Sequence, residues 1–397
     1  MIVGIKNNNR YVVPLVICFM FFISSCQGRD KEGIYVGAER FGRYVDALQN
    51  QRVAMVVNHT SYVKEKHLVD LLQEKGIKIK RIFAPEHGFR GDHSDGAKIK
   101  DGVDLRSGVE IFSLYGKYRK PTKSSMKDID VCIFDIQDVG CRFYTYISTL
   151  FYVMEACAEN NVKCIVLDRP NPNGDYVDGP VLDMKYRSFV GIAPIPVVHG
   201  CTVGELARMY KGEKWFNLSE KLDLEVIPCL NYTHSLKYIP PIAPSPNLPN
   251  YKAIRMYPSL CFFEATTVSI GRGTDFPFQV IGYPNKNYGS YAFTPVSTPH
   301  VSKYPKQEGK RCFGEKIRDE QPYDHFTFSY FYQWSQKFST VDDFVDRPKW
   351  LDLLVGDNWV RVALQNKLPI DEWKKKYSSG LSRYKKVRDK YLLYPEK

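Results

Sequence analysis

The sequence predicts an α/β protein with a parallel sheet, and three observations support this fold class. Short apolar runs rich in β-branched residues alternate with helical stretches over the first 250 residues. Strands separated by helices are typical of βαβ units and a parallel sheet. The polar residues of this part of the chain gather where the apolar runs end, which is where parallel sheets bind ligands. A proline-rich stretch at 239–250 then separates it from a more mixed second part.

The expected elements follow in order along the first part of the chain. Strands are predicted at Val53–Val57, Ile79–Ala84, Val109–Leu114, Asp130–Ile136, Lys163–Leu167 and Pro196–Val198. Helices are predicted at His67–Gly76, Ile147–Asn160 and Val203–Lys211. Thr202 can cap the last of these helices, because Glu205 lies three residues on and completes a capping box.

The second part begins after the proline-rich stretch, which we expect to be a linker or a rigid surface loop, since proline excludes helix and sheet interiors. Beyond it we expect a short aromatic strand at Phe326–Phe331 and a helix at Asp371–Leu392. A chain of 397 residues is long enough for two domains. We therefore expect domains over 36–250 and 251–397.

The first 26 residues are predicted to be a targeting segment. Lys6 and Arg10 precede the apolar run Tyr11–Ile23, which is shorter than the roughly 20 residues that span a bilayer. The run ends in Ile-Ser-Ser-Cys, similar to a bacterial lipobox, so we expect cleavage before Cys26 and lipidation of its thiol. A plain signal peptide or a signal anchor is the alternative. Residues 27–35 would form a tether, and the mature protein would be exported and lipid-anchored to a bacterial membrane, facing the periplasm or the cell surface.

Charge and cysteine content narrow the partners and cofactors. The formal net charge is +12, but basic residues concentrate only in the tail from 374 to 397, which indicates a solvated helical face rather than a nucleic-acid site. Eight of the ten cysteines lie beyond residue 26, and no Cys-x-x-Cys pair occurs. We expect most of them to be small buried hydrophobic residues, without a zinc or redox motif.

Polar side chains follow five of the predicted strands. They are Asn58 and His59, Glu86 and His87, Asp138 and Arg142, Asp168 and Arg169, and His199. The segment 84–100 is the densest, because glycines separate Glu86, His87 and Arg90 and let the backbone approach a ligand closely. The sequence therefore predicts a site at the carboxyl ends of the strands.

Several chemistries lack their motifs. No Gly-x-Gly-x-x-Gly, P-loop or Gly-x-Ser-x-Gly sequence is present, so neither a nucleotide cofactor nor a standard serine hydrolase is expected. A metal site remains an alternative, since His87 and His93 with Asp92, Asp95 and His199 could offer nitrogen and oxygen ligands. No His-Glu-x-x-His motif supports it.

Acid/base chemistry fits the carboxylates better. A glutamate such as Glu86, partly buried after a strand, can hold a proton near neutrality and donate it to a leaving oxygen. Glu264 lies between Phe263 and Ala265 and could supply the second carboxylate that glycoside hydrolysis needs, with Asp138 as competitor. The alternative for Glu264 is a structural ion pair with Arg272.

A series of motifs resembles the NamZ-type exo-β-N-acetylmuramidases, glycoside hydrolase family 171. They include Pro-Glu-His-Gly-Phe-Arg-Gly at 85–91, Asp-Ile-Gln-Asp-Val-Gly at 135–140, Arg-Phe-Tyr-Thr-Tyr at 142–146, Asp-Arg-Pro-Asn-Pro at 168–172, Ser-Pro-Asn-Leu-Pro at 245–249 and Gly-Arg-Gly-Thr at 271–274. The resemblance extends in consistent order from about Val53 to Tyr394.

The resemblance implies a Rossmann-like catalytic domain without a nucleotide, a smaller C-terminal α/β domain, and a cleft between them. The implied reaction releases terminal N-acetylmuramic acid from the non-reducing end of peptidoglycan-derived glycans, with Glu86 as the acid. Motif positions implied at the sugar site are Arg142, Tyr144, Asp168 and Asn171, and His87 and Arg90 are expected beside Glu86. Arg142, Arg169 or Arg272 would hold the lactyl carboxylate. A metal-dependent cell-wall hydrolase and a non-catalytic peptidoglycan-binding lipoprotein are the alternatives.

Overall fold

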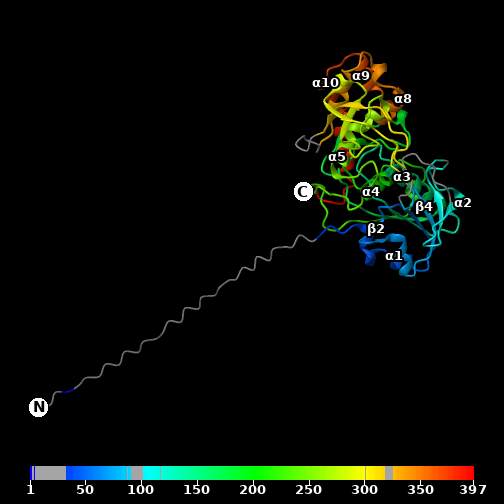
Figure 1. Ribbon diagram of the computed structural model, residues 1–397. Coiled ribbons are helices and arrows are strands. Elements are labelled where there is room, and N and C mark those ends of the chain that lie inside the picture. The colour runs from blue at the N-terminus through cyan, green and yellow to red at the C-terminus, as the bar shows by residue number, and fades with distance from the viewer. Residues whose placement is uncertain are drawn as a thin grey trace. The chain divides into compact units, whose positions relative to one another are not determined.

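A seven-stranded sheet forms the centre of the computed structural model (Figure 1). The structure describes residues 1, 4, 33–86, 88–90, 102–116, 118–299, 301–317 and 325–397. The strands lie in the order β11 (Leu224–Ile227), β8 (Lys163–Leu167), β7 (Val131–Asp135), β1 (Val53–Val57), β4 (Ile79–Ala84), β6 (Glu110–Ser113) and β5 (Gly102–Val103). All neighbours are parallel except β5, which pairs antiparallel with β6.

The topology is doubly wound. The chain proceeds from β1 to β4 and β6 on one side, then returns to β7, β8 and β11 on the other, so the order reverses between β1 and β7. This is the strand order of the Rossmann fold. The predicted α/β class is confirmed, and strands β1, β4 and β8 have the predicted bounds.

Strands β1, β7 and β8 are buried on both faces, which explains why they read as continuous apolar runs. Ala54, Val56 and Phe134 point into one apolar cluster, which also holds α3 (Tyr146–Asn160) and α4 (Val203–Gly212). Val53 and Met55 point into the other, with α1 (Leu68–Glu74). The predicted capping box is formed, since Thr202 N–H donates to Glu205 Oε2 at 2.9 Å and Thr202 Oγ1 accepts from Glu205 N.

Two predicted strands differ from the structure. Pro196–Val198 is a strand, β10, but it pairs antiparallel with β9 (Asp178–Val181) outside the central sheet, so its expected place in the parallel sheet is wrong. Phe326–Phe331 is not a strand, because residues 326–328 form a loop and residues 329–331 begin α6 (Ser329–Ser335). The aromatic rings of this segment pack on a core formed by Phe262 and Trp373, and this tertiary packing overrides the strand preference of aromatic residues.

The chain beyond residue 250 adds helices and a small antiparallel sheet. The sheet has the order β12 (Val280–Tyr283), β14 (Cys312–Lys316), β13 (Tyr291–Phe293). The helices are α5 (Tyr251–Leu260), α6, α7 (Val341–Phe344), α8 (Pro348–Val355), α9 (Trp359–Gln365) and α10 (Ile370–Arg388), and the 3-10 helix η6 (Cys261–Ala265) follows α5. The short elements α2 (Lys123–Met126), β2 (Tyr62–Val63) and β3 (Lys66–His67) complete the first part.

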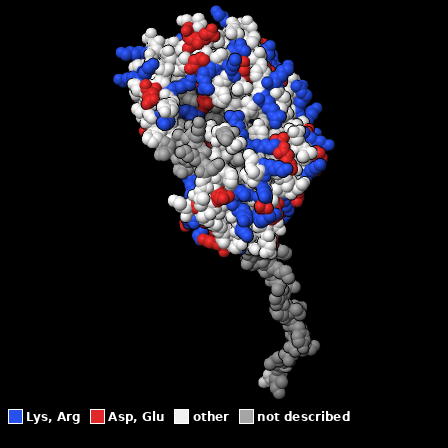
Figure 2. Space-filling view, turned by 90° about the vertical axis from the view of Figure 1, so that its right-hand side faces the viewer, with Lys and Arg blue, Asp and Glu red and all other residues white. Residues whose placement is uncertain are grey.

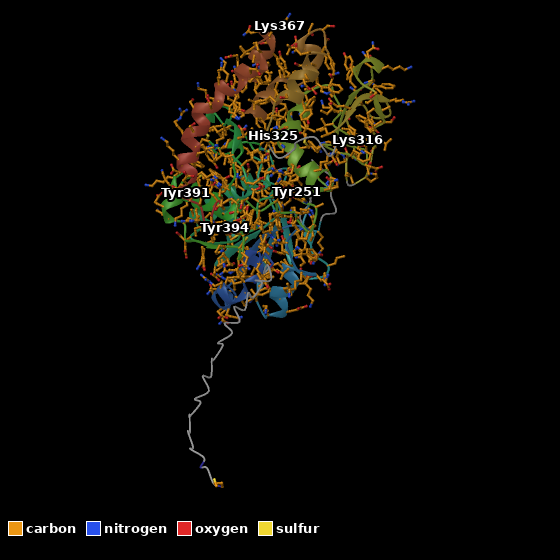
Figure 3. The ribbon with its side chains drawn as sticks, turned by 90° about the vertical axis from the view of Figure 1, so that its left-hand side faces the viewer. Tyr251, Lys316, His325, Lys367, Tyr391 and Tyr394 are labelled. Atoms are coloured by element: carbon orange, nitrogen blue, oxygen red, sulfur yellow. The ribbon has the colours of Figure 1, made fainter. Side chains whose placement is uncertain are left out.

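The second part packs back onto the first. The apolar cluster around α3 continues through Phe262 and Trp334 to Trp373. The predicted helix at 371–392 is α10, which runs from near Lys367 towards Tyr391 (Figure 3) and contacts β9. One apolar core therefore joins residues on both sides of the predicted boundary at 250, and the domain division stays a prediction.

The proline-rich segment 239–250 was expected to be either a linker or a rigid surface loop. In the structure it is a loop held in place by hydrogen bonds. His59 Nε2 lies 2.9 Å from the Ala243 carbonyl, and Tyr144 Oη donates to the Pro244 carbonyl at 2.7 Å. Ser245 and Leu248 are buried. The segment is thereby fixed across the carboxyl ends of the strands.

The distribution of surface charges and the burial of the cysteines agree with what the composition predicts. Lys and Arg side chains are spread over the face in Figure 2, with Asp and Glu between them. The eight cysteines from Cys132 to Cys312 are all buried and free, as expected for small hydrophobic residues. Among the described residues, no helix is both long and apolar enough to cross a bilayer.

Candidate active site

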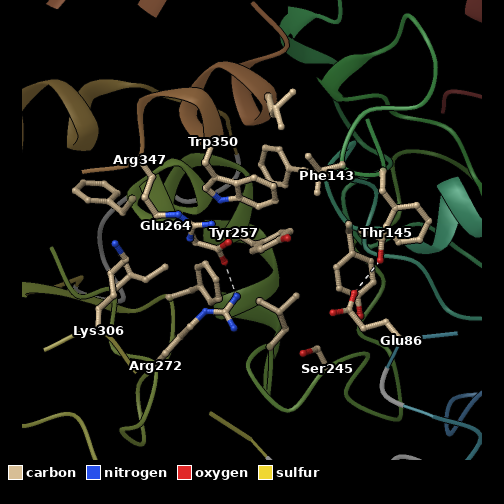
Figure 4. A pocket seen from close by; sticks show the side chains of 18 of the residues that line it. Glu86, Phe143, Thr145, Ser245, Tyr257, Glu264, Arg272, Lys306, Arg347 and Trp350 are labelled. Carbon is tan, nitrogen blue, oxygen red and sulfur yellow. Dashed lines mark hydrogen bonds and ion pairs between the residues drawn. The ribbon is translucent and has the colours of Figure 1, made fainter. Parts of the chain in front are cut away.

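A cavity of about 650 Å³ lies at the carboxyl end of the parallel strands. One wall comes from the first part of the chain and includes Glu86, Phe143 and Thr145. The other comes from the second part and includes Glu264 and Arg272. Figure 4 shows Glu86 and Glu264 on opposite sides of this pocket. Of the predicted site residues, Glu86, Tyr144, Glu264 and Arg272 line it.

Glu86 follows β4 directly and is held by the start of α3. Thr145 Oγ1 donates a hydrogen bond of 2.9 Å to Glu86 Oε2, and Tyr146 Oη donates to the Glu86 backbone carbonyl at 3.4 Å. Thr145 is the N-cap residue of α3, yet its hydroxyl caps no helix N–H. A threonine at this position ordinarily caps its own helix. The hydroxyl is directed to the carboxylate instead, which fixes Glu86 at the pocket wall.

Glu264 lies in η6 and is bound to Arg272. Arg272 Nη2 donates to Glu264 Oε1 at 2.5 Å (Figure 4), so the ion pair that the sequence allowed is present. About a quarter of each side chain is exposed. The guanidinium also lies 5.1 Å from the centroid of the Phe278 ring. Glu264 thus presents an oriented carboxylate to the pocket.

Asp138 and His199 are brought together, but behind the pocket rather than in it. Both are buried, and His199 Nε2 lies 3.9 Å from Asp138 Oδ2, which accepts the Gly140 N–H at 2.6 Å. Burial raises the pKa of Asp138 to about 7. Burial, with the nearby Arg388, lowers the pKa of His199 to about 3, so the imidazole is neutral at physiological pH.

Arg142 is completely buried and bound to backbone carbonyls. Its guanidinium donates to Pro180 and Ile195 in the first part, and to Leu354 and Val355 at the end of α8. Burial lowers its pKa to about 10. Arg142 does not line the pocket. It ties the loop that carries Phe143 and Thr145 to the helix on the opposite wall.

Asp168 and Asn171 are likewise directed into the protein. Asp168 accepts hydrogen bonds from Thr202 Oγ1, Gly204 N and Tyr394 Oη, and burial raises its pKa to about 6. Asn171 Nδ2 donates to the Cys201 carbonyl at 2.8 Å. Both residues hold the end of β8 and the loop after it.

The crevice between β1 and β7, where dinucleotides bind in Rossmann folds, is closed by local hydrogen bonds. Asn58 Oδ1 accepts from Thr60, Thr60 Oγ1 accepts from Gln137 N, and Ser61 Oγ donates to the Asp135 carbonyl. Arg169 forms a buried ion pair with Asp135 at 2.6 Å. Asn58 and Arg169 therefore lie at the strand ends but outside the pocket.

The remaining predicted residues lie elsewhere. Arg90 binds Asp104 at 2.8 Å and Asp70 at 3.3 Å, away from the pocket lining. His87 and Cys26, and His93, Asp92 and Asp95 of the metal alternative, lie outside the described residues. Within the described ranges, no group of three His, Cys, Asp or Glu side chains could hold a metal ion.

The pocket also contains residues that the sequence did not single out. Arg119, Lys306, Arg347 and Trp350 line it, and they come from loops and a helix start far apart in the chain. No local pattern marks them. Thr145 belongs to the motif Arg-Phe-Tyr-Thr-Tyr at 142–146. Its position beside a predicted helix start is the only sequence feature that indicates its contact with Glu86.

The comparisons with known proteins agree with this arrangement. Family models described as "Exo-beta-N-acetylmuramidase NamZ, N-terminal" and "Exo-beta-N-acetylmuramidase NamZ, C-terminal" match residues 53–252 and 255–394. A curated relative, the peptidoglycan β-N-acetylmuramidase NamZ of Bacillus subtilis (strain 168), is 34% identical over 385 residues, covering 88% of this chain and 89% of the relative.

Two crystal structures of DUF1343 family proteins from Bacteroides fragilis NCTC 9343 have the same fold. The first has a TM-score of 0.84 and 46% identity and covers 92% of this chain and 100% of its own. The second has a TM-score of 0.79 and 27% identity, with 91% and 99% covered. Because the family models together span both walls of the pocket, the resemblance noted in the sequence is confirmed, and the chain belongs to the NamZ family of exo-β-N-acetylmuramidases.

Proposed function

We propose that this protein is an exo-acting glycoside hydrolase that releases terminal N-acetylmuramic acid from the non-reducing end of peptidoglycan-derived glycans. One observation carries the proposal: within the matched family region, two carboxylates, Glu86 and Glu264, face each other across a pocket large enough for a sugar ring. Paired carboxylates on either side of the scissile bond are the usual machinery of glycoside hydrolysis.

Glu86 acts as the general acid in this proposal. Its proton passes to the glycosidic oxygen while the bond from that oxygen to the anomeric carbon breaks. Thr145 Oγ1 donates to Glu86 Oε2 and orients the carboxyl group at the pocket wall. Water then adds to the anomeric carbon and a water proton is returned to a carboxylate.

Glu264 serves as the second carboxylate. Positive charge develops on the sugar ring as the bond breaks, and a fixed negative charge nearby stabilises it. Arg272 orients the Glu264 carboxylate through the 2.5 Å hydrogen bond. Asp138, the other sequence candidate, is buried behind the wall. It supports the loop instead.

Aromatic rings of the pocket give the sugar a surface to pack against. Tyr144 packs edge-on against Tyr146 and Tyr257, with centroids 4.9 and 6.0 Å apart, and its hydroxyl is bonded to Pro244. These contacts hold the ring in one orientation. Rigid rings contribute contact area with little loss of conformational entropy on binding.

Product analysis tests the proposal. The purified protein is incubated with a disaccharide that has N-acetylmuramic acid at the non-reducing end and with the reverse disaccharide, each with and without a chelator. We expect free N-acetylmuramic acid from the first substrate alone, in equal amounts with chelator. Activity that is lost with chelator and restored by zinc indicates a metal-dependent hydrolase, and binding without product indicates a non-catalytic binding protein. Either result contradicts the proposal.

We also propose that the protein is exported and held at a membrane by lipidation of Cys26. The support is the basic start, the short apolar run and the lipobox-like sequence before Cys26. Mass spectrometry of the protein from cell membranes should find an acylated N-terminal cysteine, and Cys26→Ala should move the protein out of the membrane fraction. An intact N-terminus beginning at Met1 on the mature protein would contradict the proposal.

A further inference from the structure

The pocket carries more cations than its carboxylates neutralise. Arg119, Arg272, Lys306 and Arg347 line it against two acids, Glu86 and Glu264. Arg272 is bound to Glu264. Lys306 donates to the Thr266 carbonyl and lies 3.2 Å from Asp346. Arg119 and Arg347 instead form no ion pair with a carboxylate within the described ranges, so each can receive an anionic group of a ligand.

The pocket wall around Arg347 has a larger excess of positive charge than the opposite wall around Glu86. That wall carries three cations, Arg347, Arg272 and Lys306, and one pocket-lining carboxylate, that of Glu264. The opposite wall carries one cation, Arg119, and one carboxylate, that of Glu86. Asp346 offsets part of the excess but leaves a positive balance. The N-terminus of α8, which begins directly after Arg347, adds positive potential at the same place.

The position of Arg347 is fixed by the backbone. Its N–H donates to the Ala265 carbonyl at 3.1 Å, so the residue is anchored next to Glu264. Its guanidinium has only donor groups and cannot cap the N–H groups of α8, and it forms no ion pair with a carboxylate among the described residues. The guanidinium carbon lies 5.2 Å from the centroid of the Trp350 ring. Figure 4 shows both side chains reaching from the α8 region towards Glu264.

Trp350 supplies an independent observation. Its Nε1 is buried and has no hydrogen-bond acceptor among the described residues, although Trp350 lines the pocket. A buried donor without an acceptor is unfavourable unless a bound group satisfies it. A guanidinium and an indole N–H side by side suit a group that has a negative charge and more than one acceptor atom.

We propose that Arg347, with Trp350 Nε1, receives the lactyl carboxylate of the terminal N-acetylmuramic acid. The inference rests on the proposed function and names the residues that select its substrate. N-acetylmuramic acid differs from N-acetylglucosamine by this ether-linked carboxylate, so Arg347 is a specificity-determining residue. Arg142 and Arg169, which the sequence offered for this role, are buried outside the pocket lining, with the terminal nitrogens of Arg142 bound to backbone carbonyls and Arg169 paired with Asp135.

Two chromogenic substrates that differ only in charge test the inference. One is an aryl β-N-acetylmuramoside with the free lactyl carboxylate, and the other carries the lactyl group as a primary carboxamide. The wild-type enzyme should prefer the acid in kcat/KM. Arg347→Gln should lower kcat/KM for the acid by about 10- to 100-fold and for the amide much less, as expected for loss of a charge-assisted hydrogen bond. Trp350→Phe should reduce the preference to a smaller extent, and Arg347→Lys should restore part of it.

Arg119→Gln is the matched control, because it removes the same charge from the opposite wall. It should keep the preference for the acid. Equal losses on both substrates in Arg347→Gln, with an unchanged melting temperature, would overturn the inference, as would loss of the preference in Arg119→Gln or a wild-type enzyme that treats both substrates alike. A wild-type enzyme that hydrolyses neither substrate refutes the proposed function itself, which the other outcomes leave standing.

Discussion

Replacing Arg142 with methionine should destabilise the protein strongly without acting through substrate binding. The guanidinium donates four hydrogen bonds, of 2.7 to 3.0 Å, to backbone carbonyls. At about 2 kcal/mol for each bond from a charged donor, these contribute about 8 kcal/mol. Burial opposes this, because a pKa lowered from 12.5 to about 10 corresponds to about 3 kcal/mol. The expected net loss is therefore about 5 kcal/mol, as for other broken buried charge networks.

Urea unfolding followed by tryptophan fluorescence measures this loss. Arg142→Met should lower the free energy of unfolding by about 4–5 kcal/mol, and the enzyme that remains folded should keep a near wild-type KM. Arg383→Met, at an exposed position on α10, is the matched control and should change stability by less than about 0.5 kcal/mol. A loss below about 1 kcal/mol in Arg142→Met, or a raised KM at unchanged stability, would refute the structural role.

Three further predictions concern the loop after β7 and its partners. Asp138 has a folded pKa of about 7, above its unfolded value, so the wild-type protein should lose stability as pH rises from about 4 to 8. Asp138→Asn should remove about 2–4 kcal/mol of that pH dependence in denaturation at pH 5 and pH 8, and an unchanged slope contradicts the assignment. Gly140→Ala should cost about 2 kcal/mol or more in thermal unfolding, because φ is +76° and a Cβ would collide with Asn171. Gly76→Ala, with φ of +79° in open space, should cost about 1 kcal/mol, and equal losses contradict the steric argument. Thr145→Val should lower kcat about tenfold with the fold intact, since it removes the hydroxyl bound to Glu86, and an unchanged kcat would show that this contact is dispensable.

The sequence predicted the central sheet well because burial on both faces leaves an unmistakable pattern. Val53–Val57 and Lys163–Leu167 are apolar at nearly every position, and the structure buries them between two apolar clusters. The same pattern does not show which strands pair with each other, because strand pairing depends on how the chain folds back in three dimensions. Pro196–Val198 is also apolar and buried but joins an antiparallel pair outside the sheet.

The site was predictable only where a strand end points into the cavity. Glu86 and Arg142 both stand in loops that follow buried strands, yet Glu86 lines the pocket and Arg142 turns inward to four carbonyls. Local sequence does not show which way such a side chain points. Arg347 and Trp350 reach the pocket only through the packing of α8 on η6, a long-range contact without a local signal.

The central claim, that Glu86 donates the proton, is tested most directly by kcat/KM of Glu86→Gln on two muramosides with different leaving groups. A disaccharide needs protonation of its leaving oxygen, whereas a dinitrophenyl muramoside hardly does. The expected loss is about 10³-fold on the disaccharide and much smaller on the dinitrophenyl substrate, with an unchanged melting temperature. Near wild-type turnover of the disaccharide by folded Glu86→Gln would contradict the assignment of Glu86.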